Sequence, residues 1–306
     1  MKALIFPGQG AQAAGMGAGL FERFPEIVAT ANDVMGLSIE RLCLDDPHGQ
    51  LADTRYAQPA IFVVNALHLA AWRDAHDTGD DAHDTGDDAP VWLAGHSLGE
   101  YSALLAAGVF DFRTGLEIVK RRGELFASAG GGAMAAVVGV TAAELGRRLR
   151  AAGFDDIDLA NLNSAEQTVI AGPAASVDAA ASMLDAGGDV TVHPLKVSGA
   201  FHSRRMTPLK PAFEAFVSRF ALAEPARPVV SNVTARPYQP PGTPADYLVE
   251  QLDQPVRWRD SVRHMLRAGV DEWIELGPGR RILTRLVDAI RLEPPERHAA
   301  PQPALP

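Results

Sequence analysis

Short apolar runs alternate with longer segments of helical periodicity along this chain. The apolar run Lys2–Phe6 ends at a Pro-Gly pair and predicts a buried strand, and the long apolar segment Tyr56–Trp72 predicts a buried helix that begins after Pro59. We expect further strands at Val91–Ala94, Pro228–Ser231 and Glu272–Glu275, and further helices at Gly15–Met35, Pro208–Phe220 and Ser261–Ala268. Strands that alternate with helices predict a mostly parallel sheet, and hence an α/β fold.

In the segment 133–196 the predicted strands and helices follow a different order from the rest of the chain. It predicts strands at Ala133–Val140, Asp156–Asn161, Thr168–Gly172 and Val190–Lys196, with helices at Thr141–Ala152 and Ala175–Ala186. This β-α-β-β-α-β order is the ferredoxin-like split arrangement. We therefore expect residues 133–196 to form a small ferredoxin-like subdomain, inserted between residues 1–132 and 197–306 of a large subdomain.

Composition and charge exclude several classes of protein. The 306 residues are 47% hydrophobic, carry a net charge of −10 and contain one cysteine, Cys43, which excludes an intrachain disulfide and a cysteine-based metal cluster. The acidic balance argues against a nucleic-acid partner. About five apolar residues precede Pro7 and no apolar run approaches about 18 residues, so we expect neither a signal peptide nor a membrane span. We expect a soluble, cytoplasmic protein that binds neither nucleic acid nor membranes.

A perfect tandem repeat interrupts this pattern. The heptapeptide AHDTGDD at residues 75–81 recurs directly as residues 82–88, and its polar, Gly-containing composition predicts an expanded surface loop. His76 and His83 lie beside aspartates, so weak metal binding is an alternative. A loop of this kind lacks the pre-organised geometry of a metal site, and we therefore expect no bound metal.

The clearest chemical motif is Gly95-His96-Ser97-Leu98-Gly99, which matches the G-x-S-x-G nucleophile elbow. The glycines permit a tight turn from strand to helix that presents a serine hydroxyl at the end of the sheet. There the Leu98 amide and the helix N-terminus can stabilise an oxyanion. The alternative is a simple glycine-bounded turn, but an apolar strand before the motif and a helical segment after it favour a nucleophile.

A serine nucleophile needs a base, and the chain offers nine histidines. Most of them lie in polar loops or on helices, where packing or solvation explains them. His96 is adjacent to Ser97, but the sharp turn should point the two side chains apart. His202, in SGAFHS, follows a predicted strand and precedes a predicted helix, so it is the best candidate for a base at the rim of the site.

The loop FPGQGAQ follows the first strand and resembles a phosphate-binding glycine loop at first sight. It lacks the G-x-G-x-x-G spacing, because Gly8 and Gly10 are followed next by Gly15. A dinucleotide site is therefore disfavoured. A backbone amide donor beside the serine is the better use of such a loop.

Eight motifs together resemble one family, the malonyl-CoA:acyl-carrier-protein transacylases. They are FPGQGAQ, GHSLGE, KRRG, ANLNSAEQTVIAG, GAFHS, SNVTARP, QLDQPVRW and ELGPG, in the family's order over residues 3–287. The chain looks most like the discrete acyltransferases that serve polyketide synthases lacking their own acyltransferase domains. The resemblance implies an α/β-hydrolase-like core with a parallel sheet and a ferredoxin-like subdomain, in agreement with the predicted insert.

The resemblance also implies roles for the chemistry-bearing residues. Ser97 resembles the family's nucleophile and His202 its general base. Gln9 and Leu98 resemble the positions whose backbone amides form the oxyanion hole. The implied reaction has two steps: Ser97 takes a malonyl group from malonyl-CoA, and the phosphopantetheine thiol of an acyl carrier protein then receives it. No metal or cofactor is implied, since CoA is part of the substrate.

Further residues line the implied acyl pocket. Arg122 resembles the arginine that holds the free carboxylate, and the main-chain carbonyl of Gln251 matches the one that orients the imidazole. Asn161 and Asn163 line the same region in relatives without an assigned step. Phe201 resembles malonyl-selective relatives, since methylmalonyl-selective ones usually have a serine there.

One pair of residues departs from the family pattern. Phe126-Ala127 stands where relatives usually carry Met-Gln, so the resemblance does not determine which side chains line the acyl pocket there.

Four alternatives to a malonyl transferase remain: an acyl hydrolase of the same fold, a transferase of a larger carrier-bound acyl unit, an α/β-hydrolase thioesterase, and a non-catalytic docking module.

Carrier proteins are generally acidic, and a chain at −10 must attract them through a local positive patch, because screening limits charge effects to about 8–10 Å. Arg204 and Arg205 follow His202 directly and are the first candidates. Arg280 and Arg281, after ELGPG, are the second. The alternative is that these are ordinary surface arginines.

Overall fold

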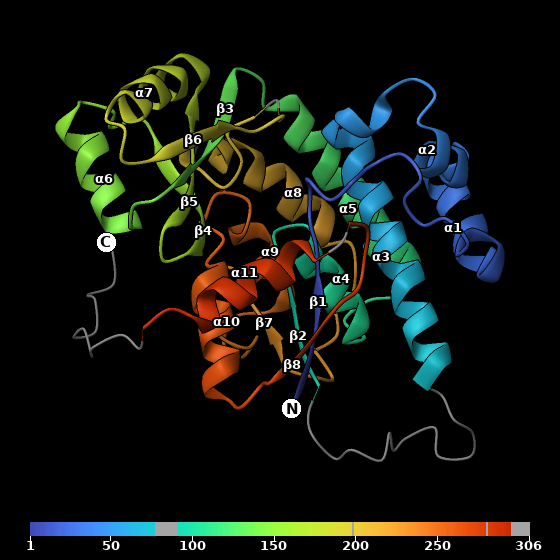
Figure 1. Ribbon diagram of the computed structural model, residues 1–306. Coiled ribbons are helices and arrows are strands. Elements are labelled where there is room, and N and C mark those ends of the chain that lie inside the picture. The colour runs from blue at the N-terminus through green and yellow to red at the C-terminus, as the bar shows by residue number, and fades with distance from the viewer. Residues whose placement is uncertain (77–90, 198, 280, 295–306) are drawn as a thin grey trace.

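The computed structural model describes residues 1–76, 91–197, 199–279 and 281–294 (Figure 1). Within these residues, four parallel strands form the sheet of a large subdomain, in the order β7-β2-β1-β8. The strands are β1 (Lys2–Phe6), β2 (Trp92–Gly95), β7 (Val229–Val230) and β8 (Glu272–Glu275). The parallel sheet and its strand positions confirm the α/β prediction.

Both faces of this sheet are covered by helices, as a parallel sheet requires. Leu4 and Phe6 of β1 pack into a core with α3, α4 and α5, whereas Ala3 and Ile5 pack into a second core with α10 and α11. The helices on the first face are α3 (Thr54–His76), α4 (Gly99–Ala106) and α5 (Phe112–Ser128). Those on the second are α10 (Trp258–Arg267) and α11 (Ile282–Arg291).

Further helices belong to the large subdomain. They are η1 (Phe21–Arg23), α1 (Pro25–Met35), α2 (Ile39–Asp45), η2 (Gln50–Ala52), η3 (Arg204–Leu209), α8 (Lys210–Val217) and α9 (Pro244–Glu250). No helix in the part of the chain that the structure describes combines the length and apolar character needed to cross a membrane.

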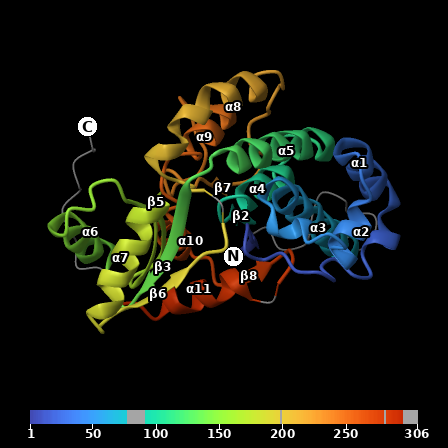
Figure 2. The ribbon, with the colours of Figure 1, turned by 90° about the horizontal axis from the view of Figure 1, so that it is seen from above.

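The small subdomain is an antiparallel sheet with helices on its outer side (Figure 2). Its elements are β3 (Gly132–Val138), α6 (Ala142–Ala151), β4 (Asp158–Ser164), β5 (Gln167–Pro173), α7 (Ala174–Ala186) and β6 (Thr191–Pro194). The order β4-β5-β3-β6 confirms the ferredoxin-like arrangement. Val137 and Ile170 face α6 and α7, whereas Met134 and Val169 belong to the core of the large subdomain.

Backbone hydrogen bonds join the two subdomains along β4. The amide of Leu162 donates to the carbonyl of Val256 at 2.9 Å, and the amide of Val256 donates to the carbonyl of Ala160 at 2.8 Å. The edge strand of the small sheet is thereby paired with a segment of the large subdomain. This pairing brings Asn161 and Asn163 to the end of the parallel sheet.

Several local predictions were wrong. Helix α3 begins at Thr54, ahead of Pro59, because complete burial of Ala57 to Leu67 outweighs the hydrogen bond that the proline lacks. Residues 15–20 form turns rather than the start of a helix. Most of the 75–88 repeat lies outside the described residues.

The contact between the elbow and β1 gives a first prediction. A Cβ on Gly99 would collide with the main-chain oxygen of Phe6, whereas a Cβ on Gly130 meets nothing within 4 Å. Gly99→Ala should therefore lower the free energy of unfolding by about 3 kcal/mol or more, and Gly130→Ala by less than about 0.5 kcal/mol. Urea unfolding midpoints measure both. Equal midpoints for the two variants would contradict this packing.

Candidate active site

Ser97 lies in a strained turn between β2 and α4. Its φ of 52° is left-handed, which costs free energy for a residue with a side chain. Two hydrogen bonds of Asn232 hold this turn: the Ser97 amide donates to Asn232 Oδ1 at 2.7 Å, and Asn232 Nδ2 donates to the Gly95 carbonyl at 2.7 Å. A Cβ on Gly95 would collide with the Gly99 backbone, so the turn needs both glycines. This is the geometry expected of a nucleophile elbow.

His202 approaches Ser97 from the segment that connects the small subdomain to η3. Its Nε2 lies 2.7 Å from Ser97 Oγ, and its Nδ1 lies 2.9 Å from the main-chain oxygen of Gln251. A carbonyl only accepts hydrogen bonds, so Nδ1 carries the proton and Nε2 accepts from the serine hydroxyl. The structure thus brings together the predicted nucleophile and base, 105 positions apart in the sequence.

The His202 imidazole is held in its neutral form. Burial, together with the nearby positive charge of Arg122, lowers its pKa to about 3. At neutral pH the imidazole is therefore unprotonated, which is the state in which it can take a proton from Ser97.

Arg122 of α5 is a buried cation beside the nucleophile. Its Nη2 lies 3.0 Å from Ser97 Oγ and 3.1 Å from Gln251 Oε1, and its Nη1 lies 2.8 Å from Gln58 Oε1. The guanidinium carbon is 4.1 Å from the centre of the Phe126 ring. Among the described residues, Arg122 forms no ion pair with a carboxylate, and its hydrogen-bond partners are neutral oxygens. The nearby Glu100 carboxylate favours its charge without a hydrogen bond to it.

The main-chain amides of Gln9 and Leu98 are the predicted donors of the oxyanion hole. Gly8 packs against the elbow so tightly that a Cβ there would collide with the main-chain oxygen of His96. Within the part of the chain that the structure describes, neither amide donates a hydrogen bond. The Gln9 side chain is anchored by Thr54 and Gln58, at 3.0 and 3.3 Å. Both amides are thus available as donors to an oxyanion.

Aromatic rings pack beside the base. The Phe126 and Phe201 rings lie 4.7 Å apart, and Phe126 meets the His202 ring edge-on at 6.3 Å. Phe126, at the position that departs from the family pattern, thus contacts both the cation and the base.

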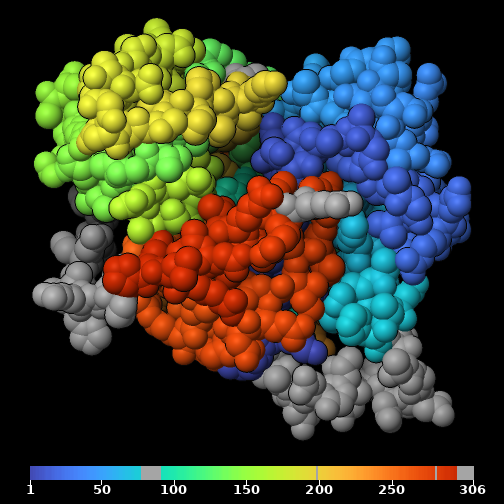
Figure 3. Space-filling model, in the orientation of Figure 1, coloured from blue at the N-terminus to red at the C-terminus, as the bar shows by residue number. Residues whose placement is uncertain are grey.

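The small subdomain reaches the elbow through its asparagines. Asn163 Oδ1 lies 2.9 Å from His96 Nε2, so the His96 side chain points away from Ser97 as predicted. Asn161 has a buried Oδ1 without a hydrogen-bond partner among the described residues. On the face shown in Figure 3 the surface is hollowed where the small subdomain, in green and yellow, meets the blue N-terminal segment.

The proposed docking arginines are not equivalent. Arg204 is exposed, and its guanidinium and main-chain amide bind Asp158, which compensates its charge in the predicted docking patch. Arg205 is exposed and has no ion pair with any described residue. Arg281 pairs with Asp288 at 2.8 Å, and Arg280 lies outside the described residues.

Glu100 and Asn232 belong to the site, and the sequence reasoning assigned them no role. Glu100 is fully buried, and burial raises its pKa to about 7 against the opposing effects of its hydrogen bonds and of Arg122. Both residues stand inside quoted motifs, GHSLGE and SNVTARP. A single charged residue in the helical segment EYSALLAAG was the available signal.

No cluster of three or more metal-ligating side chains exists among the residues described here, and His83 lies outside them.

Comparison with known proteins identifies the family. Residues 3–302 match the acyl transferase domain. The chain is 45% identical to the polyketide biosynthesis malonyl CoA-acyl carrier protein transacylase BaeC of Bacillus velezensis, over 96% of this chain and 98% of BaeC. It is 39% identical to a malonyl CoA-acyl carrier protein transacylase of Synechocystis, over 93% of this chain and 92% of that protein.

Solved structures agree with these relatives. The malonyl CoA-acyl carrier protein transacylase of Burkholderia pseudomallei superposes with a TM-score of 0.89 at 45% identity, over 97% of this chain and 99% of that one. A malonyl-transacylase in complex with a type II polyketide acyl carrier protein gives 0.85 at 34% identity, over 94% and 92%. The chain therefore belongs to the acyltransferase family and, within it, to the malonyl-CoA:acyl carrier protein transacylases.

The protonation state of the His202 imidazole tests the electrostatics of this site. NMR of the imidazole should show it neutral from about pH 8 to pH 5, because burial and the charge of Arg122 depress its pKa. Arg122→Ala removes one cause of that depression, so protonation of the imidazole should begin at a higher pH. Arg121→Ala, on the exposed side of the same helix, is the matched control. A native imidazole that titrates near pH 6.5, the value of a free imidazole, would disprove this assignment.

Proposed function

We propose that this protein transfers a malonyl group from malonyl-CoA to the phosphopantetheine thiol of an acyl carrier protein through an ester on Ser97. Arg122 carries the proposal, because it is a buried cation 3.0 Å from Ser97 Oγ with no carboxylate partner among the described residues. An unpaired buried charge is costly. The free carboxylate of a malonyl group offers a guanidinium two parallel hydrogen bonds, which an acetyl group cannot.

The first half-reaction loads the enzyme. His202 Nε2 takes the hydroxyl proton as Ser97 Oγ attacks the thioester carbonyl, and the amides of Gln9 and Leu98 donate to the resulting oxyanion. Loss of one such donor typically costs about 3–4 kcal/mol of barrier. The oxyanion collapses, the carbon–sulfur bond breaks, and CoA leaves as a thiol with the proton from His202.

The second half-reaction repeats these roles with a new nucleophile. His202 takes the proton of the phosphopantetheine thiol, the sulfur attacks the malonyl ester, and Ser97 regains its hydroxyl proton. Every proton that moves is carried by His202, so these steps call for no metal ion or cofactor. In the hydrolase alternative, water replaces the thiol as acceptor in the same cycle. In the other alternative, the transferred group is a larger carrier-bound acyl unit. The pairing of Phe126 and Phe201 beside the base favours a small, unbranched malonyl group over both branched and larger ones.

The relatives' names support the partner and the pathway. BaeC and the PksC protein of Bacillus subtilis are named as polyketide biosynthesis transacylases, and a solved relative is bound to a carrier protein. We therefore propose that this chain acts in polyketide biosynthesis, and the cytoplasm stays the predicted compartment. Arg205 remains the predicted contact for an acidic carrier protein, and Arg204 is a weaker candidate because Asp158 compensates its charge.

Mass spectrometry after mixing with malonyl-CoA tests the dyad. The native protein should gain one malonyl group on Ser97 and lose it on addition of a carrier protein that bears phosphopantetheine. Ser97→Ala should gain none, and His202→Ala should be acylated about 10² to 10⁴ times more slowly, the usual contribution of a general base. Full transfer by Ser97→Ala would exclude the mechanism.

Competition between malonyl-CoA and acetyl-CoA tests Arg122. Arg122→Ala should slow malonyl loading about 10²-fold or more, because hydrogen bonds to a charged group worth roughly 1.5–3 kcal/mol each are lost. Acetyl loading should change much less, so the preference for malonyl falls. Arg121→Ala, with its side chain at the surface of α5, should keep the native preference. If Arg122→Ala discriminates as the native protein does, the carboxylate is bound elsewhere.

A further inference from the structure

Glu100 is a buried carboxylate for which the mechanism above has no step. It stands in the first turn of α4 and is fully inaccessible to solvent. Its main-chain amide donates to the Ser97 carbonyl at 3.1 Å, but its carboxylate has no hydrogen bond to either Ser97 or His202. Three donors meet it: the Tyr238 hydroxyl at 2.6 Å, the Asn232 main-chain amide at 3.2 Å, and Gln251 Nε2. All three come from segments that follow β7, far from α4 in the sequence.

One of these donors leads to the base. Gln251 Nε2 donates to Glu100 and to the Ser97 carbonyl, the latter at 3.0 Å, while Gln251 Oε1 accepts from Arg122 at 3.1 Å. The main-chain oxygen of the same Gln251 accepts from His202 Nδ1. The carbonyl that orients the imidazole therefore belongs to a residue whose side-chain amide is held by hydrogen bonds at both its oxygen and its nitrogen.

Another donor leads to the nucleophile. The main-chain amide of Asn232 donates to Glu100 Oε1, and the side chain of Asn232 holds the left-handed turn at Ser97 through its bonds to the Ser97 amide and the Gly95 carbonyl. One carboxylate thus anchors both residues that position the catalytic pair, without touching either member of it.

We propose that Glu100 is the positioning residue of this active site, which sets the imidazole of His202 through Gln251 and the main chain of Ser97 through Asn232. The inference rests on the proposed function for the reaction that it serves. The positioning role of Glu100 itself requires only that Ser97 and His202 react as a pair, whichever acyl group is transferred.

A carboxylate is required at this position by the direction of the hydrogen bonds. Arg122 has donors only, so Gln251 must turn Oε1 toward it and Nε2 toward Glu100. An amide in place of Glu100 cannot satisfy Gln251 Nε2 while its own NH2 group faces that donor. Turning Gln251 over places its NH2 group against Arg122 instead. Every arrangement of Glu100→Gln that keeps its acceptor on Asn232 and Tyr238 therefore contains two opposed donors.

Single-turnover acylation at pH 8 tests the proposal, with Ser97 labelled in parallel by malonyl-CoA and by a fluorophosphonate. Glu100→Gln should lower the limiting rate with both probes about 10- to 100-fold, the loss expected from a misplacement of about 1 Å. The half-saturating concentration of malonyl-CoA should stay within about threefold of the native value, because Arg122 keeps its bonds to Gln58. Proton NMR gives an independent readout: the buried Nδ1–H signal of His202, identified by its absence in His202→Ala, should shift or broaden in Glu100→Gln.

Glu293→Gln is the matched control. Glu293 is also a buried carboxylate, and it binds the Ala165 amide and Arg259 at 2.6 and 2.7 Å, away from the dyad. This variant should lose stability but keep the native acylation rate and NMR signal. A rate within twofold of native in Glu100→Gln, with either probe, would overturn the proposal.

Gln251→Met keeps the main-chain carbonyl but removes the amide that links it to Glu100, so it serves if Glu100→Gln does not fold. It should also be slower than native, and the double variant should be no slower than the slower single one, because both break the same link. Native rates in Gln251→Met, or fully additive losses, would also overturn the proposal. If the native protein reacts with the fluorophosphonate but forms no malonyl ester, the proposed function fails while the test of Glu100 still stands.

Discussion

A guanidinium buried beside the nucleophile, without a carboxylate to pair with, is the constraint on which this active site depends. Burying such a charge is unfavourable unless polar groups surround it. Here the amide oxygens of Gln58 and Gln251 and the face of Phe126 do so in part. The amide of Gln251 is also a dipole between two charges, with its oxygen toward Arg122 and its nitrogen toward Glu100. A substrate carboxylate is suited to neutralise the part of the Arg122 charge that these groups leave uncompensated.

The same charge sets the state of the base. Arg122 disfavours a proton on His202, and burial does so more strongly, so the imidazole is ready to accept one. A malonyl carboxylate on Arg122 would cancel much of that repulsion and make the imidazole more basic as the substrate arrives. Charge recognition and general-base catalysis are therefore linked through one residue.

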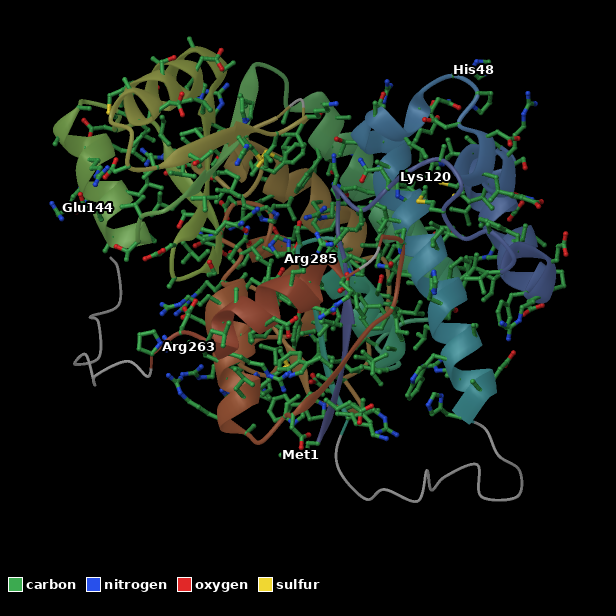
Figure 4. All side chains as sticks on the ribbon, viewed as in Figure 1. Met1, His48, Lys120, Glu144, Arg263 and Arg285 are labelled. Carbon is green, nitrogen blue, oxygen red and sulfur yellow. The ribbon has the colours of Figure 1, made fainter. Side chains whose placement is uncertain are left out.

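The site also depends on how the subdomains meet. The elbow belongs to the parallel sheet, and Arg122 to α5, which packs against α3. Lys120 of the same helix is labelled in Figure 4. His202 follows the last strand of the small subdomain. The pairing of β4 with Val256 and the contact between Asn163 and His96 fix that subdomain against the elbow. The inserted sheet thus forms one wall of the site.

The features that could be predicted from the sequence are those encoded by neighbouring residues. Apolar runs located β1, β8 and the ferredoxin-like insert, and glycine spacing located Ser97. His202 emerged by elimination among the histidines. Arg122 required the family resemblance, because a helix arginine has the same local pattern as its exposed neighbour Arg121. Glu100 and Asn232 were missed because their partners, Tyr238 and Gln251 for Glu100 and Gly95 for Asn232, are distant in the sequence. The early start of α3 was missed because burial outweighs the effect of Pro59.

The central claim is that the charge of Arg122 is held for the acyl group's carboxylate. The most direct measurement is a crystal structure of the protein with a malonyl ester on Ser97. The account predicts both carboxylate oxygens within hydrogen-bonding distance of the Arg122 guanidinium, with His202 Nδ1 still bonded to the Gln251 carbonyl. A malonyl carboxylate that points to solvent, with Arg122 still bonded only to Gln58, Gln251 and the serine oxygen, would contradict it.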